Sequence, residues 1–265
     1  MKIPFAKLHG AKNDFLITKV EDMPVADLQE VAIAICDRYT GVGADGWMLL
    51  GDPEAGEPCI RLFNSDGSEP ELSGNGTRCA AAMLALSHSD QKEFRIRTGA
   101  GVKHLRLISR GKHDFHFEMN MGNIRVVEPA AVVQGYDAVI VDAGNPQCVF
   151  PVSDFDFDWR SVGAATEKDR RFPNRTNVSF IRKIDRHAIE ARFWERGAGE
   201  TNSSGTGSTG AATAAIARGF AESPVTVQTP AGPLVLRFEP EAWLSGPAQY
   251  IADGVFYYAK IGRDD

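Results

Sequence analysis

The chain has 265 residues, of which 43% are hydrophobic and 24% charged, as expected for a globular protein with a full core. Its net charge is -6 and it has no basic run, so we exclude a nucleic-acid partner, because nothing would neutralise the phosphates. No stretch approaches the roughly 18 apolar residues that cross a membrane, and the N-terminal sequence lacks a signal-peptide pattern. We therefore expect a cytoplasmic protein with no membrane partner.

Four scattered cysteines and six histidines form no metal-binding spacing. The cysteines are typical of reduced, mostly buried residues of a cytosolic protein. We therefore predict no metal site and no other cofactor, and expect a small molecule as the partner.

The residue pattern predicts strands and helices in two similar halves. The first half is predicted to contain strands over about 3–9 and 14–20, an amphipathic helix over 27–39, strands over 47–50 and 59–63, a helix over 75–87 and antiparallel strands within 93–121. The second half is predicted to contain strands over about 138–141 and 148–151, a helix within 156–168, strands over 177–183 and 188–194, a helix over 206–220 and strands within 225–238 and 250–261.

The helix predicted over 206–220 is nearly all Ala, Gly, Thr and Ile, which is too small and apolar for a surface helix. We expect strands to surround it. Each half is therefore predicted to be a mostly antiparallel sheet curled around a central helix, an α+β plan. An exposed edge at the last strand, over 250–261, would allow pairing into a homodimer, but the periodicity does not decide whether the edge is exposed.

One stretch of the chain occurs twice. RLFNSDGSEPELSGNGTRCAAAM (Arg61–Met83) aligns without a gap on RFWERGAGETNSSGTGSTGAATA (Arg192–Ala214), 131 residues later. Each copy leads from an apolar strand through a polar turn to Ser-Gly-x-Gly and a small-residue helix. Ser73 and Ser204 occupy the same position, immediately before the glycine.

A helix N-terminus with free N–H groups binds anions, and glycines let its backbone approach a ligand closely. Two such ends that face each other would hold one carboxylate and acidify the neighbouring C–H bond. Glu195, Arg196 and asparagines at turns supply further acceptors and donors. This set suits a zwitterionic amino acid.

Six motifs of the chain resemble, in order, the motifs of the diaminopimelate epimerase family. They are HGAKNDF (His9–Phe15), GVGADG (Gly41–Gly46), FNSDGSEPELSGNGTRC (Phe63–Cys79), DAGNPQCV (Asp142–Val149), RTNVSF (Arg175–Phe180) and ERGAGETNSSGTGSTGAA (Glu195–Ala212). The resemblance implies two pseudo-symmetric domains, 1–119 joined by the returning strand 252–265, and 120–251, with the site in the cleft between them.

The resemblance also implies cofactor-free inversion of LL-diaminopimelate to the meso form by two-base proton transfer at the α-carbon, for lysine and peptidoglycan biosynthesis. Ser73 and Ser204 hold the positions of the catalytic residues. The resemblance assigns substrate binding to Asn13, Asn64, Gly74, Asn75, Asn145, Asn177, Glu195, Arg196, Gly205 and Thr206.

The chain departs from the family at informative positions. The family has cysteines where this chain has Ser73 and Ser204, a histidine at Gln147 and a glycine at Lys12. A thiol has a pKa of about 8.5 and a serine hydroxyl one near that of water, about 15.7, so the serines lack on the order of 10 kcal/mol of basicity. A helix dipole contributes at most about 2 kcal/mol, and the sequence places no histidine to activate them.

Three interpretations remain. The first is an epimerase in which the serines work more slowly, assisted by Lys12 or a water molecule. The second is a diverged isomerase, racemase or dehydratase that acts on another amino acid or small carboxylate, for which a desolvated Lys12 is a candidate base. The third is a catalytically inactive homologue that binds an amino acid.

Overall fold

The computed structural model describes residues 1–23, 27–51 and 56–259. Contacts divide the chain into two compact units. Unit 1 comprises Met1–Phe117 and Pro247–Asp265, and unit 2 comprises Glu118–Gly246. The boundaries expected from the sequence, after residues 119 and 251, lie a few residues from these.

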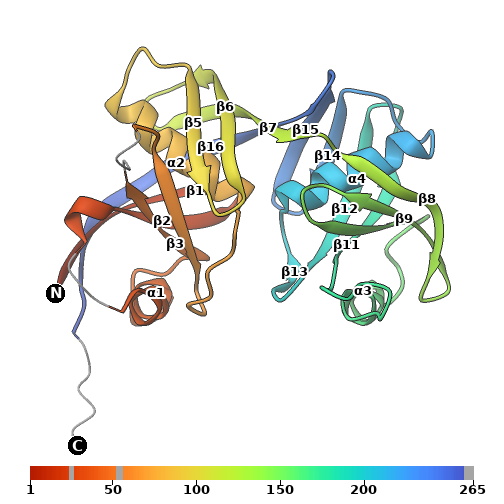
Figure 1. Cartoon of the computed structure of the whole chain (residues 1–265), viewed down its shortest axis with the longest axis horizontal. Coiled ribbons are helices and arrows are strands. Elements are labelled where there is room, and N and C mark those ends of the chain that lie inside the picture. The colour runs from red at the N-terminus through yellow and green to blue at the C-terminus, as the bar shows by residue number, and fades with distance from the viewer. Residues whose placement is uncertain (24–26, 52–55, 260–265) are drawn as a thin grey trace, which may run out of the picture. The chain divides into compact units, whose positions relative to one another are not determined.

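Unit 1 is a ring of strands around one helix (Figure 1). Its elements are β1 (Lys2–Gly10), β2 (Asn13–Lys19), α1 (Leu28–Cys36), β3 (Gly46–Gly51), β4 (Cys59–Asn64), α2 (Gly74–Ser87), β5 (Glu93–Thr98), β6 (Gly101–Arg110), the start of β7 (Asp114–Gly122) and the end of β16 (Ala242–Tyr257). The strands follow the order β1 to β7 and then β16, which pairs with β1. The helix α2 contacts β1, β2, β4 and β5.

The two helices of unit 1 form for different reasons. In α1, the side chain of Asp27 caps the N-terminus by accepting from the N–H groups of Gln29 and Glu30. The apolar face of α1, which includes Val31 and Ile35, packs in a core cluster with Trp47. The helix α2 instead buries alanines along most of its length, because the surrounding strands leave room for little else.

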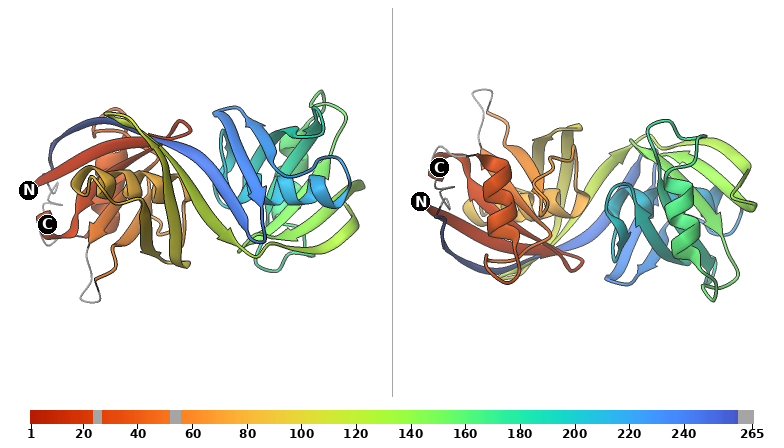
Figure 2. Two further views of the ribbon diagram at one scale, coloured as in Figure 1. Left: turned by 90° about the horizontal axis from the view of Figure 1, so that it is seen from above. Right: turned by 90° about the horizontal axis from the view of Figure 1, so that it is seen from below.

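Unit 2 repeats this plan with different strand lengths. Its elements are β8 (Arg125–Val133), β9 (Tyr136–Asp142), β10 (Pro146–Pro151), α3 (Trp159–Glu167), β11 (Asn177–Lys183), β12 (Ala188–Glu195), β13 (Gly199–Thr201), α4 (Gly205–Ala217), β14 (Val225–Thr229), β15 (Gly232–Phe238) and the start of β16. The helix α4 contacts strands β8 to β12, β14 and β15 and lies among them (Figure 2). The α+β plan with a central small-residue helix in each half is therefore confirmed.

Some expectations about the strands are wrong. The strands β8 and β13 were not predicted, because most of β8 is exposed and carries no alternation, while β13 has three residues. The strand β16 begins at Ala242 rather than near Tyr250. It is also not an exposed edge, because it pairs with β1 and lies beside β7 in the sheet order. That argument for a homodimer is therefore withdrawn, and part of the strand expected over 250–261 lies outside the described residues.

The turn between β1 and β2 is strained. Gly10 pairs with Asn13, and the two residues between them have positive φ, 51° at Ala11 and 62° at Lys12. Such turns normally use Asn or Gly, because a side chain in this left-handed region costs about 1–2 kcal/mol. The strain lies directly before Asn13, a predicted substrate-binding residue.

We predict that Lys12→Gly raises the free energy of unfolding by about 0.5 kcal/mol, because relief of strain exceeds the entropic cost of glycine. Chemical denaturation would measure the change. The matched control is Lys19→Gly at the end of β2, where φ is -71° and glycine brings only its cost. A loss of stability in Lys12→Gly as large as that in the control would contradict the assignment of strain.

Candidate active site at two helix N-termini

The two serines cap their helices in the same way. Ser73 (φ -126°, ψ 118°) precedes α2, and Ser204 (φ -136°, ψ 124°) precedes α4. The Ser73 Oγ accepts the N–H of Gly76 at 3.1 Å, and the Ser204 Oγ accepts the N–H of Gly207 at 3.1 Å. The repeat in sequence is therefore a repeat in local geometry, and each hydroxyl lies at the positive end of a helix.

The second glycine of each motif has a packing role. A Cβ on Gly207 would lie 2.8 Å from the Ser204 Oγ and 2.9 Å from Phe193. A Cβ on Gly76 would lie 3.3 Å from the Ser73 Cβ. We expected these glycines to admit a ligand, but the protein itself already requires them to be small.

In unit 2 the Ser204 hydroxyl has a carboxylate partner. It donates to Glu195 Oε2 at 2.9 Å, and Thr201 donates to Glu195 Oε1 at 2.6 Å. The β12–β13 hairpin brings Thr201 beside Phe193, two residues from Glu195, through a turn with Gly197 and Gly199 at positive φ. Burial raises the pKa of Glu195 above its usual value, although the hydrogen bonds from Thr201 and Ser204 oppose this.

Ser73 in unit 1 lacks such a partner. The residue aligned with Glu195 is Asn64, whose Nδ2 donates to Ser68 Oγ at 2.9 Å. Within the described chain, no carboxylate accepts a hydrogen bond from the Ser73 hydroxyl. The two helix ends therefore share geometry but differ in chemistry.

Other predicted binding residues of unit 2 lie next to α4 and in neighbouring loops. Asn145 Nδ2 donates to Thr206 Oγ1 at 3.4 Å, and the buried Gln147 donates to Asn145 Oδ1 at 2.6 Å. Asn177 Oδ1 accepts the backbone N–H of Arg196 at 3.0 Å. The exposed Arg196 guanidinium donates to the Asn174 carbonyl at 2.9 Å. Asn145 with Thr206 and Asn177 with Arg196 are thus brought together in pairs.

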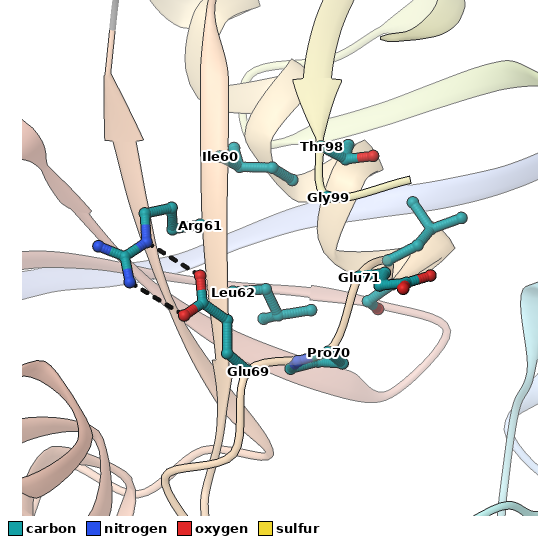
Figure 3. A pocket seen from close by; sticks show the side chains of 10 residues that line it. Ile60, Arg61, Leu62, Glu69, Pro70, Glu71, Thr98 and Gly99 are labelled. Carbon is teal, nitrogen blue, oxygen red and sulfur yellow. Dashed lines mark hydrogen bonds and ion pairs between the residues drawn. The ribbon is translucent and has the colours of Figure 1, made fainter. Parts of the chain in front are cut away.

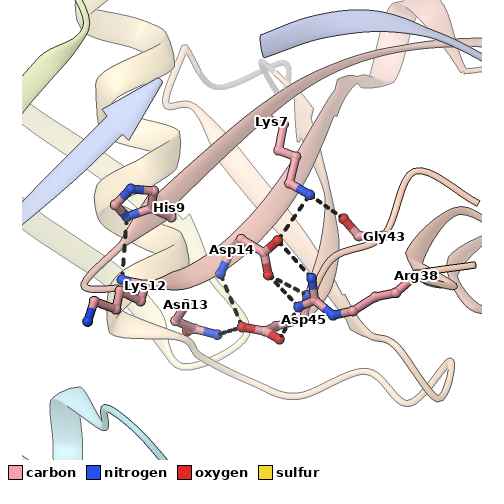
Figure 4. A network of polar contacts seen from close by, with 8 residues as sticks. All are labelled: Lys7, His9, Lys12, Asn13, Asp14, Arg38, Gly43 and Asp45. Atoms are coloured by element: carbon pink, nitrogen blue, oxygen red, sulfur yellow. Dashed lines mark hydrogen bonds and ion pairs between the residues drawn. The ribbon is translucent and has the colours of Figure 1, made fainter. Parts of the chain in front are cut away.

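In unit 1, Asn13 takes part in a polar network with Asp14, Arg38 and Asp45 (Figure 4), and Asn75 bonds to it. Asn75 Nδ2 donates to Asn13 Oδ1 at 3.2 Å, and Asn13 Nδ2 donates to Asp45 Oδ2 at 2.7 Å. The cation Arg38 binds both Asp14 and Asp45. Burial alone would raise the pKa of Asp14, but hydrogen bonds from Arg38 and Lys7 hold it below its usual range. Lys12 lies exposed at the tip of the hairpin.

A pocket of about 260 Å³ in unit 1 reaches Ser73 (Figure 3). It lies where β4 and β5 share one paired position, Cys59 with Arg97, and then diverge. Ile60, Leu62 and Leu72 give it an aliphatic wall, and the ion pair between Arg61 and Glu69 lies beside it. The pocket can hold a short aliphatic group beside Ser73.

The three buried thiols do not replace the missing cysteines. Burial raises the pKa of the Cys36, Cys79 and Cys148 thiols to about 12. Among the described residues, no group of His, Cys, Asp and Glu side chains is placed to hold a metal ion. Within the same part of the chain, no helix is long and apolar enough to cross a membrane.

Sequence reasoning placed both serines at helix N-termini but did not single out several residues of the polar contacts described above. These are Thr201 in unit 2, and Asp45 and Arg78 in unit 1. It also assigned Glu195 to the substrate without its bond to Ser204. A signal was present, since two glycines between Glu195 and Thr201 favour a tight hairpin that returns a hydroxyl to the carboxylate.

The fold places the chain among proteins that share this two-unit architecture. A phenazine biosynthesis protein of the PhzF family from Bacillus anthracis matches with a TM-score of 0.72 at 13% identity, covering 96% of this chain and 99% of that one. A hydroxyproline epimerase from Agrobacterium vitis matches with a TM-score of 0.70 at 13% identity, covering 96% of this chain and 90% of the other. At these identities the likeness concerns the fold.

Sequence comparison identifies the family. The model of the family described as diaminopimelate epimerase matches residues 5–127 and 139–251. A diaminopimelate epimerase of Moorella thermoacetica is 35% identical over 95% of this chain and 98% of its own length. The chain belongs to the diaminopimelate epimerase family, which comprises isomerases, and the resemblance seen in its motifs is confirmed.

We predict that Glu195→Gln changes stability in a pH-dependent way. The raised pKa of Glu195 means that its contribution to folding is fully present below its unfolded pKa, near 4.5, and is lost as pH rises through the folded value. Removing the charge should therefore raise the melting temperature more at about pH 7 than at about pH 4, as calorimetry would show.

The matched control is Glu190→Gln on the same strand. Burial would raise the pKa of Glu190, but Arg182 and Arg192 lower it overall, so its contribution is present at neutral pH and is lost on acidification. This variant should lose more stability at about pH 7 than at about pH 4. The same pH trend in both variants would contradict the environment assigned to Glu195.

Proposed function

We propose that the chain epimerises LL-diaminopimelate to the meso form without a cofactor, with Ser73 and Ser204 as the residues that exchange protons with the α-carbon. The observation that carries this is the hydrogen bond of 2.9 Å from Ser204 to Glu195 at the N-terminus of α4. It supplies the activating group that a serine needs. Family membership supports the substrate, and a biosynthetic role of this kind supports a cytoplasmic location.

The substrate α-carboxylate would bind the helix N-termini, through the backbone N–H groups of Gly74, Asn75, Gly205 and Thr206. Asn13, Asn64, Asn145, Asn177 and Arg196 would bind its remaining polar groups. The N–H groups stabilise the negative charge that the carboxylate gains when the α-proton leaves. Formation of a homodimer stays a prediction.

Proton removal at Ser204 can proceed as a relay. The α-proton moves to the Ser204 Oγ while the hydroxyl proton of Ser204 moves to Glu195 Oε2. The electron pair of the C–H bond passes into the carboxylate, which becomes an enediolate. Ser73 then gives its proton to the opposite face of the carbon while a water molecule protonates the Ser73 Oγ, and Glu195 releases the proton it has taken up to solvent. No free alkoxide is needed at Ser204, because the proton ends on a carboxylate.

The relay reduces the energetic deficit estimated from the sequence. The pKa of a lone serine hydroxyl lies about 7 units above that of a thiol, so the hydroxyl is costly to ionise. The pKa of a carboxylate, near 4.5, lies about 4 units below that of a thiol, and each unit corresponds to about 1.36 kcal/mol. Burial raises the pKa of Glu195 and so reduces the pKa difference between this carboxylate and a thiol. Glu195 is thus a weaker base than a thiolate, but it can accept the proton of Ser204 without help from Lys12 or a histidine.

The test is α-proton exchange in deuterated water, followed by NMR. We expect deuterium incorporation into LL-diaminopimelate and formation of the meso isomer. One isomer presents its α-hydrogen to Ser204. For that isomer, deuterium should replace the α-hydrogen with retention of configuration faster than the configuration inverts, because Ser73 has no carboxylate partner. Binding without exchange would establish an inactive amino-acid-binding relative, and neither binding nor exchange would point to another substrate.

We predict that Ser73→Cys raises the epimerisation rate by more than Ser204→Cys does. A thiol at position 73 titrates near 8.5 at a helix N-terminus that lowers its pKa further. A thiol at position 204 would meet the Glu195 carboxylate, whose charge opposes thiolate formation. Steady-state kinetics of both single variants, with folding checked by circular dichroism, would measure this. Equal gains would contradict the difference between the two ends.

Binding by Arg196 can be tested separately. Its guanidinium bonds only one backbone carbonyl among the described residues, so it is free to pair with a carboxylate. We predict that Arg196→Ala weakens diaminopimelate binding at least tenfold, about 1.4 kcal/mol, as calorimetry would show. Unchanged affinity would remove Arg196 from the site.

A further inference from the structure

Arg78, a residue of α2, carries a buried cationic side chain. Its side chain has no exposed surface. Nη2 donates to Asn75 Oδ1, Nε donates to the Pro247 carbonyl at 3.3 Å, and Nη1 has no hydrogen-bond partner within the described chain. Burial lowers the pKa of Arg78 to about 10, so the guanidinium stays charged at neutral pH. No carboxylate among the described residues pairs with it, and a buried charge in this state is costly.

The guanidinium begins a chain of hydrogen bonds that ends at a carboxylate. Arg78 donates to Asn75 Oδ1, Asn75 donates to Asn13 Oδ1 at 3.2 Å, and Asn13 donates to Asp45 Oδ2 at 2.7 Å. Asp45 is held in turn by Arg38 Nη2 at 2.7 Å and by the backbone N–H of Asp14 at 3.1 Å. Figure 4 shows the end of the chain at Asn13 and Asp45.

The two ends of this chain determine which way both amides point. A guanidinium only donates and a carboxylate only accepts. Asn75 must therefore turn its oxygen to Arg78, which leaves its NH₂ group for Asn13. Asn13 must turn its NH₂ group to Asp45, which leaves its oxygen for Asn75. Reversing either amide would set donor against donor or acceptor against acceptor, so only one arrangement of the chain satisfies every group.

The corresponding chain of unit 2 has no such fixed ends. Gln147 donates to Asn145, which donates to Thr206. An amide and a hydroxyl each both donate and accept, so this chain can reverse without loss of a hydrogen bond. The residue aligned with Arg78 is Thr209, whose hydroxyl donates to the Gly205 carbonyl at 2.8 Å.

We propose that Arg78 and Asp45 are positioning residues that lock the amides of Asn13 and Asn75, so that Asn13 presents its second N–H to a substrate carboxylate. This deepens the proposed function and rests on it. Asn13 is half-buried at the hairpin, whereas Asn75 and Arg78 lie inside, so Asn13 is where the chain meets a ligand. The locked amide favours an acceptor such as a carboxylate over an ammonium group.

The first measurement needs no activity. Side-chain amide signals of Asn13 and Asn75 are assigned by NMR in the full chain and compared in Arg78→Met, Arg78→Lys and Asp45→Asn. We expect Arg78→Met to shift or broaden the Asn13 signal, which Arg78 does not touch, and Arg78→Lys to restore it in part, because lysine also only donates. The control is Ala85→Gly, a buried change that destabilises α2 without touching the chain of hydrogen bonds.

The second measurement separates positioning from folding. Arg78→Met and Asp45→Asn should each raise KM for diaminopimelate about tenfold with a smaller change in kcat, and the double variant should lose less than the sum, because both act on one chain. An unmoved Asn13 signal in Arg78→Met overturns the proposal, as does a moved signal with unchanged KM. Failure of the wild type to turn over diaminopimelate would instead refute the proposed function, while the Asn13 signal still decides whether the amide is locked.

Discussion

The structure depends on burying a helix inside a curled sheet twice over. Strands that surround a helix leave room for small side chains, so α2 and α4 bury runs of alanine and glycine. The fit is close, since a Cβ on Gly210 would lie 2.9 Å from the Gln147 side chain. A helix held in this way cannot shift, so its N-terminus becomes a rigid element that carries a hydroxyl and free N–H groups at a fixed place in its unit.

Local patterns allowed much of this to be predicted from the sequence. The duplicated Ser-Gly-x-Gly motif located both helix starts and both capping serines, because capping depends on residues three apart in the chain. The pairing of Glu195 with Ser204 and Thr201 was not predicted, since it depends on how the β12–β13 hairpin folds back. The burial of Arg78 was not predicted, because spacing along the chain does not tell which side of α2 the strands cover. The strand β8 escaped prediction because neither face of it is regularly buried.

The N-terminal ends of α2 and α4 have similar backbones, but the buried charged groups that the two units associate with them have opposite sign. In unit 1 the cation Arg78 is buried within α2, and a chain of hydrogen bonds leads from it through Asn75 to Asn13. In unit 2 the charged group is Glu195, which accepts from the Ser204 hydroxyl. A cation behind a helix N-terminus strengthens anion binding and favours proton donation, whereas a carboxylate that touches a hydroxyl favours proton removal. Duplicated backbone geometry thus supports two different roles, one for each unit.

This difference follows from what a hydroxyl needs. A thiol near a helix N-terminus ionises without help from a neighbouring base. A site with two thiols can therefore be built from two helix N-termini with the same surroundings. A serine needs a neighbour that accepts its proton, and that neighbour must stay basic. Thr201 and Ser204 already donate to both oxygens of Glu195, and both bonds lower its pKa. A substrate ammonium group bound to Glu195 would lower it further and weaken the base. In the proposed site the amino group would therefore bind the amide oxygens of Asn145 and Asn177, and Glu195 would remain the proton acceptor of Ser204.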